Sequence, residues 1–282
     1  PGCAFRSRGS PQSAALIRTE PSQVKLQIDV QLDYWFAQAC DVLLQIEAAT
    51  LPDQTVEQTR VTVSPGEHFS RVAAQDGIGT RIWLRVQGQM LVDYTASVTI
   101  SREVHDYAAL PAAAFHRLPG EAVQYLMPSR YCPSNQFADF VDARFGTLSG
   151  GAKIAAMRDW IADHLSYVPG SSNADTTALD TFHDRAGVCR DYAHLMIALA
   201  RAADIPARMA SVYAPGVTPP DFHAVAEVFL GDTWHIVDAT GMAASARDVA
   251  IIGIGRDIGD VAFLTAFGPL MMNSQSVAVR NV

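Results

Sequence analysis

An unbroken alternation of apolar and polar residues begins at Val24 and continues to Phe36. Every second position is apolar, namely Val24, Leu26, Ile28, Val30, Leu32, Tyr34 and Phe36. A period of two is typical of a strand in an antiparallel sheet that buries one face. The pattern predicts an N-terminal antiparallel β-sandwich, a region without a concentration of catalytic residue types. Further strand-like runs follow at residues 42–48, 60–63, 81–86 and 90–103.

The pattern becomes mixed after a linker at residues 110–120, where proline and small residues dominate. Apolar residues recur at helical spacing between positions 153 and 165, and strands are expected at 208–213 and in a hairpin after Phe222. We therefore expect an α+β chain. Its expected parts are a disordered or artificial lead at 1–20, the β-sandwich domain at 21–110 and an α+β domain at 111–282.

A second helix is predicted to begin at Cys189, which shares a stripe of apolar residues at helical spacing. The polar residues fall mostly on other faces, and His194 is expected to be solvated or to act as a cap. The helix should end near Asp204, because Pro206 lacks a donor N–H and disfavours helical geometry in the residue before it. A helix N-terminus stabilises a thiolate through its free N–H groups and its dipole, so the Cys189 sulfur has a setting suited to a nucleophile.

A β-hairpin is predicted to follow, with a tight turn at 231–232 that we expect to have two residues. With that turn, Leu230 pairs with Thr233. In this register His223 and Asp238 become diagonal neighbours on one face, with Cα atoms roughly 7–8 Å apart. A shift by one residue would send the two side chains to opposite faces, so their contact depends on the turn.

Cys189, His223 and Asp238 thus supply, in chain order, a thiol nucleophile, an imidazole base and a carboxylate that orients the base. Each also has a simpler interpretation: a small buried apolar residue, a structural histidine and a turn cap. The backbone N–H of Cys189 is a natural oxyanion donor. Three aromatic residues have the chemistry of a second donor, although such residues are more often part of a core: Tyr131, Trp160 and Tyr167.

The most specific part of the sequence lies between residues 187 and 240. It contains the runs GVCRDYA at 187–193, PAR at 206–208, FHA at 222–224 and WHIVDAT at 234–240. These runs resemble the core of the transglutaminase-like superfamily of cysteine enzymes, which is similar to the papain-like proteases in its active-site logic. The N-terminal strands resemble the β-rich domain of a bacterial subgroup proposed to be cysteine proteases. The resemblance covers about residues 24–282.

The resemblance implies a papain-like or transglutaminase-like α+β catalytic domain. It implies Cys189 as the nucleophile, His223 as the base and later the acid, and Asp238 as the group that holds the imidazole tautomer. The reaction would be acyl transfer on a peptide or protein amide bond through a thioester.

Three functions fit this resemblance. Hydrolysis by a peptidase or amidase is favoured, because bacterial members with this two-domain layout are usually described that way. Transfer to a lysine amine would make the protein a cross-linking transglutaminase. A binding or scaffold module on the same fold is the non-catalytic alternative. In each case the proline-rich loop at 214–220 is expected to form the rim that sets access to the site.

Composition and motifs argue against other classes of function. The net charge of −8 argues against a nucleic-acid partner. The sequence contains no phosphate loop of the Walker or dinucleotide type, and no apolar run that approaches the ~20 residues of a membrane span. We therefore expect a peptide or protein amide substrate, no nucleic acid and no membrane partner, and the oligomeric state is left open.

The cysteines and histidines lack the paired spacing of zinc sites, and no EF-hand pattern occurs, so no metal and no cofactor is predicted. Four irregularly spaced cysteines indicate free thiols in a reducing compartment, and the predicted location is the cytoplasm. Three of them, Cys3, Cys40 and Cys132, do not begin a helix and are predicted not to be catalytic. His235 has the opposite strand parity to Asp238 and is expected to face away from it.

Overall fold

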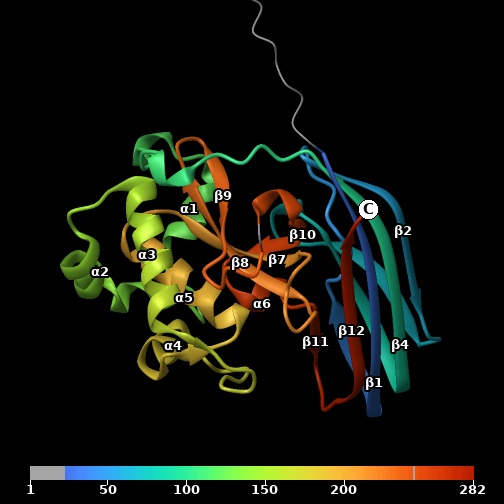
Figure 1. The fold of residues 1–282 in the computed structure, drawn as a ribbon. Helices are drawn as coiled ribbons and strands as arrows, with labels where there is room; N and C mark the ends of the chain where they lie inside the picture. The colour runs from blue at the N-terminus through green and yellow to red at the C-terminus, as the bar shows by residue number, and fades with distance from the viewer. Residues whose placement is uncertain (1–22, 244) are drawn as a thin grey trace, which may run out of the picture.

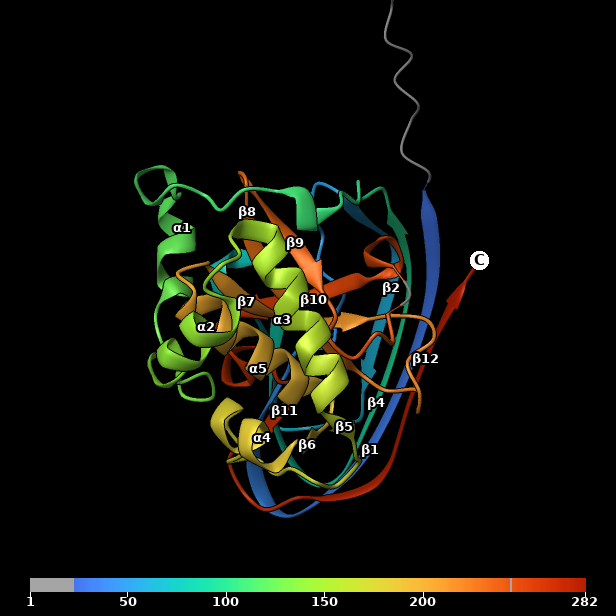
Figure 2. The same ribbon diagram turned by 60° about the vertical axis from the view of Figure 1, so that its left-hand side comes forward.

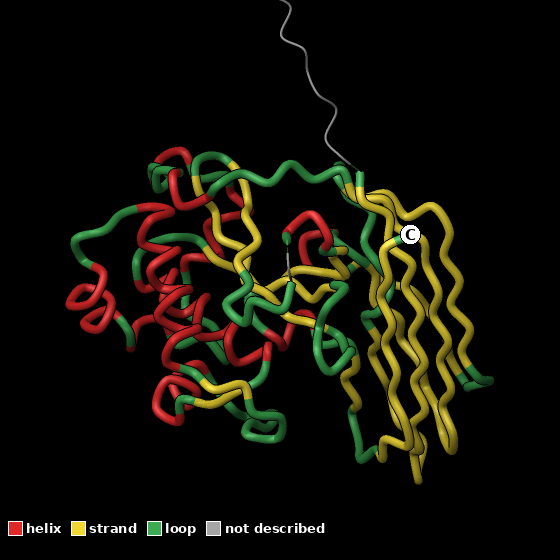
Figure 3. Tube along the Cα trace, viewed as in Figure 1, coloured by secondary structure: helices red, strands yellow, loops and turns green. Residues whose placement is uncertain are grey.

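The computed structural model describes residues 23–243 and 245–282. Figure 1 shows helices on one side, a four-stranded sheet in the middle and a long, curved sheet on the other side. Figure 3 shows the same separation of helices and strands along the molecule. Both sheets are antiparallel, so the predicted α+β class is confirmed. The predicted lead at 1–20 lies outside the described residues, and the domain division near residue 110 stays a prediction.

Two very long strands form the centre of the long sheet. β1 (Val24–Leu44) pairs with β4 (Thr80–Ile100) along almost its whole length, with an irregularity after Phe36. Buried and exposed residues alternate along β1, as its period of two predicts. Strands β2 and β3 pair with β4, while β11 and β12 pair with β1. The bounds of these four are β2 Gln54–Val63, β3 His68–Ala73, β11 Leu264–Ala266 and β12 Met271–Asn281.

The prediction of a sandwich within the first region was wrong in one respect, because the strands of that region lie in a single sheet. Two strands from the end of the chain complete this sheet, and its buried face packs against the second region. There Tyr213, Phe222 and Ile252 join the core residues of β1 and β4, and Tyr213 Oη donates a hydrogen bond to the Ile46 carbonyl oxygen at 2.6 Å. A period of two predicts that one face is buried, but it does not identify the layer that covers that face.

The four-stranded sheet has the order β10-β7-β8-β9. Its strands are β7 (Ala207–Tyr213), β8 (His223–Leu230), β9 (Thr233–Val237) and β10 (Ala250–Gly255). The predicted hairpin is confirmed, because β8 and β9 are joined through residues 231–232 and Leu230 pairs with Thr233. The strand predicted at 208–213 is confirmed as β7.

Helix α5 (Cys189–Ala202) begins at the predicted residue and packs on the four-stranded sheet. Figure 2 shows α2, α3 and α4 gathered around it. The helix ends just before Asp204, whose φ of 59° is left-handed, and the Ile205 N–H closes the end on the Ala200 carbonyl at 3.0 Å. The other helices are α1 Gly120–Val123, α2 Ala138–Phe145, α3 Gly150–His164, α4 Ala178–Asp184 and α6 Ile258–Val261.

Two short strands and several single-turn 3₁₀ helices connect these elements. The strands are β5 (Ser166–Tyr167) and β6 (Ala186–Gly187), which pair in parallel. The 3₁₀ turns lie at Gln75–Gly77, Tyr107–Ala109, Phe115–Arg117, Gln124–Leu126, Ser134–Gln136 and Ala246–Asp248. In the described part of the chain, no helix is long and apolar enough to cross a membrane. The cytoplasmic location stays a prediction.

The polar side of α5 is buried, so the expectation that His194 is solvated was wrong. Asp191, His194 and Arg201 are each at most 3% exposed. The sheet covers one side of α5 and other helices cover the rest, which leaves no side of the helix to solvent. Two of these buried groups form hydrogen bonds within the protein: His194 Nε2 accepts the Ile258 N–H at 3.2 Å, and Arg201 donates to the Ala207 carbonyl at 2.9 Å. His194 Nδ1 has no hydrogen-bond partner among the described residues.

Candidate active site

Cys189 is the first residue of α5 and is only partly buried. The start of the helix is fixed by Asp191, whose fully buried carboxylate accepts the Val188 N–H at 2.8 Å. Arg190 donates to the same carboxylate at 3.1 Å and to the Ser172 hydroxyl at 2.8 Å, which ties the preceding loop to the helix. The cysteine backbone is thereby held in one place, with its thiol at the free N–H end of the helix.

The Asp191 side chain explains why a glycine stands at position 187, two residues before Cys189. A Cβ atom at position 187 would lie 2.7 Å from the Asp191 Cβ, which is closer than two such carbons can approach. The strand and the start of the helix can therefore come together only if residue 187 is glycine. This role follows from the fold and is not visible in the sequence pattern.

His223 begins β8, and its ring lies against Asp238 just after the end of β9. His223 Nε2 is 3.0 Å from Asp238 Oδ2, as the predicted register of the hairpin requires. The carboxylate is held on its other side by the Thr240 N–H at 2.8 Å, the Thr240 hydroxyl at 2.7 Å and the Ala243 N–H at 2.8 Å. Burial raises the pKa of Asp238, but these hydrogen bonds and the positive charge of His223 outweigh it, and the pKa is lowered overall.

The other side of the His223 ring faces Cys189. Nδ1 is buried and has no well-aligned hydrogen-bond partner among the described residues. Burial alone would lower the pKa of His223, but the hydrogen bond with Asp238, the nearby Cys189 thiol and the negative charges of both groups raise it to about 9. The raised pKa favours the protonated imidazole beside the sulfur, an arrangement that stabilises a thiolate.

Tyr167 is the aromatic residue that contacts Cys189. Its strand β5 pairs with β6, where Tyr167 lies opposite Gly187. Burial and the negative charge of Cys189 raise the pKa of the Tyr167 phenol to about 12, while a hydrogen bond from the Cys189 backbone N–H lowers it. Tyr167 thus lies beside Cys189, close enough for the two groups to affect each other electrostatically.

The other two aromatic candidates lie elsewhere. The Tyr131 ring stacks on His194 at 5.3 Å between ring centres. The Trp160 ring stacks on His164 at 4.6 Å, and the Arg185 guanidinium lies over it. Both belong to packed clusters of side chains, in agreement with the core interpretation of polar-tipped aromatics.

Cys40, Cys132 and His235 are apart from this group. Cys132 is fully buried, and burial raises the pKa of its thiol to about 12; Cys40 is buried within β1. Neither begins a helix, and Cys3 lies outside the described residues. His235 pairs with Val228 and packs against His105, with 6.4 Å between ring centres. Within the described residues, no three His, Cys, Asp or Glu side chains are placed to hold a metal ion; that the protein needs no metal stays a prediction.

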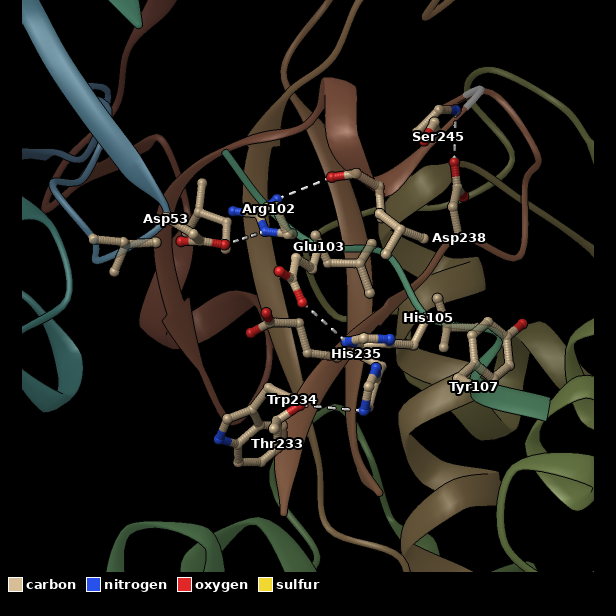
Figure 4. A pocket seen from close by; sticks show the side chains of 18 of the residues that line it. Asp53, Arg102, Glu103, His105, Tyr107, Thr233, Trp234, His235, Asp238 and Ser245 are labelled. Atoms are coloured by element: carbon tan, nitrogen blue, oxygen red, sulfur yellow. Dashed lines mark hydrogen bonds and ion pairs between the residues drawn. The ribbon is translucent and has the colours of Figure 1, made fainter. Parts of the chain in front are cut away.

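A cavity of about 630 Å³ lies beyond Asp238 and was not anticipated from the sequence. Asp238 lines it, but His223 and Cys189 do not, so the cavity is at the far end of the series Cys189–His223–Asp238. Figure 4 shows Arg102 and His105, which follow the end of β4, and Trp234 and His235 of β9 among the residues that line this cavity. Asp238 therefore borders a second pocket as well as the imidazole.

Comparison with known proteins agrees with this architecture. A model of the transglutaminase-like superfamily matches residues 140–239, a range that contains Cys189, His223 and Asp238. An uncharacterised protein of Mycobacterium leprae (strain TN) is 30% identical over 148 residues, which are 49% of this chain and 53% of that protein. The chain thus spans about half the length of this curated relative.

A crystal structure from Cytophaga hutchinsonii, of a protein proposed to be a cysteine protease, is similar over nearly the whole length. It is 30% identical to the chain described here, and the two superpose with a TM-score of 0.86. The match covers 93% of this chain and 91% of the Cytophaga chain. The similarity includes the long sheet as well as the helical layer. The chain described here belongs to the transglutaminase-like superfamily.

Proposed function

We propose that this protein transfers the acyl group of a peptide or protein amide through a thioester on Cys189, and that water is the usual acceptor. The observation that carries the proposal is the linked series in which Asp238 contacts His223 and His223 faces the Cys189 thiol. Each member has the chemistry that the next one needs: an anion beside the imidazole, and an imidazolium beside the sulfur.

The first half of the reaction forms the thioester. The Cys189 thiolate attacks the amide carbonyl carbon, and the carbonyl oxygen becomes an oxyanion. The His223 imidazolium then donates its proton to the amine nitrogen as the carbon–nitrogen bond breaks, so that a neutral amine leaves. His223 is left neutral, and Asp238 keeps its ring oriented through the hydrogen bond at 3.0 Å.

The second half releases the acyl group. Neutral His223 accepts a proton from water, the resulting hydroxide attacks the thioester carbon, and the carbon–sulfur bond breaks to give a carboxylic acid and the thiolate. An amine in place of water would give a new amide, which is the cross-linking alternative. The two outcomes differ in the acceptor and not in the three side chains.

The oxyanion has two candidate donors at the start of α5. One is the Cys189 backbone N–H, and the other is the hydroxyl of Tyr167, a residue beside Cys189. A carbonyl oxygen that enters between them would be within reach of both. Donors fixed in advance at this position stabilise the charge that develops in the transition state.

Selective alkylation tests the nucleophile independently of any substrate. Limiting iodoacetamide at pH 6 should modify Cys189 well before Cys40 or Cys132, and His223→Ala should abolish this preference. Equal reactivity of the three thiols would contradict the proposal and favour the binding-module alternative. The sites of modification are identified by mass spectrometry.

The acceptor is then tested with one substrate and two readouts. Fluorescein-labelled casein is incubated with the protein, with and without dansylcadaverine, and with Cys189→Ala as the control. Release of small fluorescent peptides supports hydrolysis, whereas dansyl incorporation without cleavage supports cross-linking. If neither product forms although Cys189 is reactive, casein lacks the amide that this site accepts. The assay is then repeated with carboxymethylated lysozyme.

A further inference from the structure

A groove of about 480 Å³ runs along one edge of the long sheet. One wall is the loop between β7 and β8, and the other is β12, where every residue from Gln275 to Arg280 contributes. Figure 2 shows this loop reaching toward β12. Side chains of a strand alternate between its two faces. A groove that touches a consecutive run of residues must therefore lie along the edge of the strand, where the backbone is accessible.

The backbone of β12 has unused hydrogen-bonding groups on this edge. Among the described residues, β12 pairs with β1 alone. The Val282 N–H donates to the Lys25 carbonyl at 3.0 Å, which sets the parity of the antiparallel pair. By that parity the N–H and C=O groups of Val277 and Val279 point away from β1, into the groove. An accessible strand edge of this kind is a template for a further strand.

One end of the groove lies near the start of β8, where His223 stands. Asp221 lines the groove and stands two residues before His223. Gln275 joins the two walls there, because its side-chain amide donates to Asp221 at 2.6 Å. Asp221 is also close enough to Tyr167 to add to the effects of burial and of Cys189 that raise the pKa of that phenol. A chain that lies along β12 would therefore continue past Asp221 toward the thiol.

Asp221 gives this end of the groove a negative charge without a partner. Its Oδ1 accepts the Phe222 N–H at 2.7 Å and the Gln275 amide, and no cation pairs with it within the described part of the chain. Burial raises the pKa of Asp221, as it does for a carboxylate that lacks a positive neighbour. Arg280, farther along the groove, is already paired with Asp29. A positively charged group on a ligand would therefore complement this end of the groove.

We propose that an extended segment of the polypeptide substrate binds along β12 as an additional strand, between β12 and the β7–β8 loop, with a lysine, arginine or terminal ammonium group at Asp221. This inference rests on the proposed function and names its substrate class: an unfolded or loosely folded chain with a basic residue near the reacting amide. Most of a folded protein's surface presents no free strand to pair with Val277 and Val279, so the groove favours extended segments.

Amide hydrogen exchange with the Cys189→Ala protein tests this binding in the absence of turnover. The probes are N-acetylated hexapeptides of alternating threonine and valine, with one lysine at the first or the last position. One of these peptides should slow exchange of the Val277 and Val279 amides by about tenfold or more at saturation. The Ala278 and Arg280 amides should not change, because they are already bonded to β1. Protection at every second amide is the result expected for strand addition, whereas binding to one face of the sheet would not distinguish the amides in this way.

A pair of substitutions at one position tests the backbone contact. Val279→Pro removes an N–H that points into the groove and breaks no bond to β1, whereas Val279→Ala keeps that N–H. We expect Val279→Pro to weaken peptide binding by about tenfold or more and Val279→Ala to bind within about threefold of the parent. An unchanged alkylation rate of Cys189 in the same substitutions made on the active chain shows that each variant is folded.

Asp221→Asn tests the charge. The lysine peptide should bind more tightly than its alanine and glutamate counterparts, and this order should disappear in Asp221→Asn, which keeps the oxygen that accepts from Phe222 and Gln275. Equal binding of the three peptides by the parent protein would overturn the role of Asp221.

Three results would overturn strand addition: no binding of any probe up to about 1 mM, equal binding by the proline and alanine variants, or protection that rises with protein concentration when no peptide is present. The last would mean that a second copy of the chain occupies the edge. None of these results bears on the reactivity of Cys189, so failure of this inference and failure of the proposed function are observed separately.

Discussion

His223 Nε2 lies 3.0 Å from Asp238 Oδ2; His223 begins β8, and Asp238 directly follows β9, the strand joined to β8 by a two-residue turn. The turn fixes the register, and the register brings the imidazole to the carboxylate. Three further hydrogen bonds from Thr240 and Ala243 hold the carboxylate. The orientation of the histidine ring is therefore determined by backbone pairing that is complete before any substrate binds.

Asp238→Asn should slow alkylation of Cys189 at pH 6 and reduce turnover of any accepted substrate by about 10²-fold or more. The asparagine keeps the shape of the side chain but removes the negative charge that helps to raise the pKa of His223 to about 9. The imidazolium, and with it the thiolate, should then be less populated. The measurement is the rate of iodoacetamide labelling between pH 5 and 9.

Asp232→Asn is the matched control for this change, because residue 232 lies in the exposed turn of the same hairpin. It removes one negative charge without touching His223. If both variants lost the same fraction of the labelling rate, the effect would come from net charge and the assignment of Asp238 would be wrong.

Tyr167→Phe should separate the two roles that a hydroxyl at Cys189 can have. As an oxyanion donor, it acts on amide turnover but not on alkylation by iodoacetamide, which forms no oxyanion. We expect kcat to fall by about 10²-fold or more, while the labelling rate changes by less than about tenfold. Tyr192→Phe is the control, since the Tyr192 ring packs against Tyr167 with 6.0 Å between centres. An equal loss in both assays would instead assign Tyr167 to thiolate stabilisation.

Local periodicity and turn chemistry were sufficient to predict the parts of the site that follow one another closely in the chain. The start of α5 at Cys189 and the pairing of Leu230 with Thr233 are both local features. The contact between His223 and Asp238 follows from them because strand geometry carries the register from the turn to the ends of the strands.

The features that the sequence did not reveal depend on contacts between distant segments. Tyr167 could be distinguished from Tyr131 and Trp160 only after the pairing of β5 with β6 was known. The burial of Asp191 depends on the surrounding helices and on Gly187. The cover over the long sheet comes from strands more than a hundred residues away, and alternation within one strand carries no information about them.

Gly187→Ala should destabilise the protein and disturb Cys189 together. The new Cβ would meet the Asp191 side chain at 2.7 Å, so Asp191 must move and the start of α5 with it. We expect the free energy of unfolding to fall by about 1–3 kcal/mol, with a slower alkylation of Cys189. Gly120→Ala is the control, because a Cβ there has no neighbour within 4 Å. A Gly187→Ala protein with normal stability and normal labelling would contradict this account of the motif.

The fully buried His194 should make the fold sensitive to acid. Burial lowers the pKa of His194 to about 3, so the folded protein keeps this ring neutral while the unfolded chain takes up a proton below its ordinary value of 6.5. A depressed pKa in the folded state means that the stabilising contribution is complete above pH 6.5 and is lost as the pH falls toward 3. Between about pH 6.5 and pH 5, the free energy of unfolding should fall by about 2 kcal/mol because of this residue.

Urea unfolding at several pH values across this range measures how the free energy of unfolding changes with pH. His194→Gln, which cannot be protonated but can still accept the Ile258 N–H, should flatten this dependence, whereas His164→Gln on the exposed end of α3 should leave it unchanged. An identical slope in the parent and in His194→Gln would show that other groups govern the acid sensitivity.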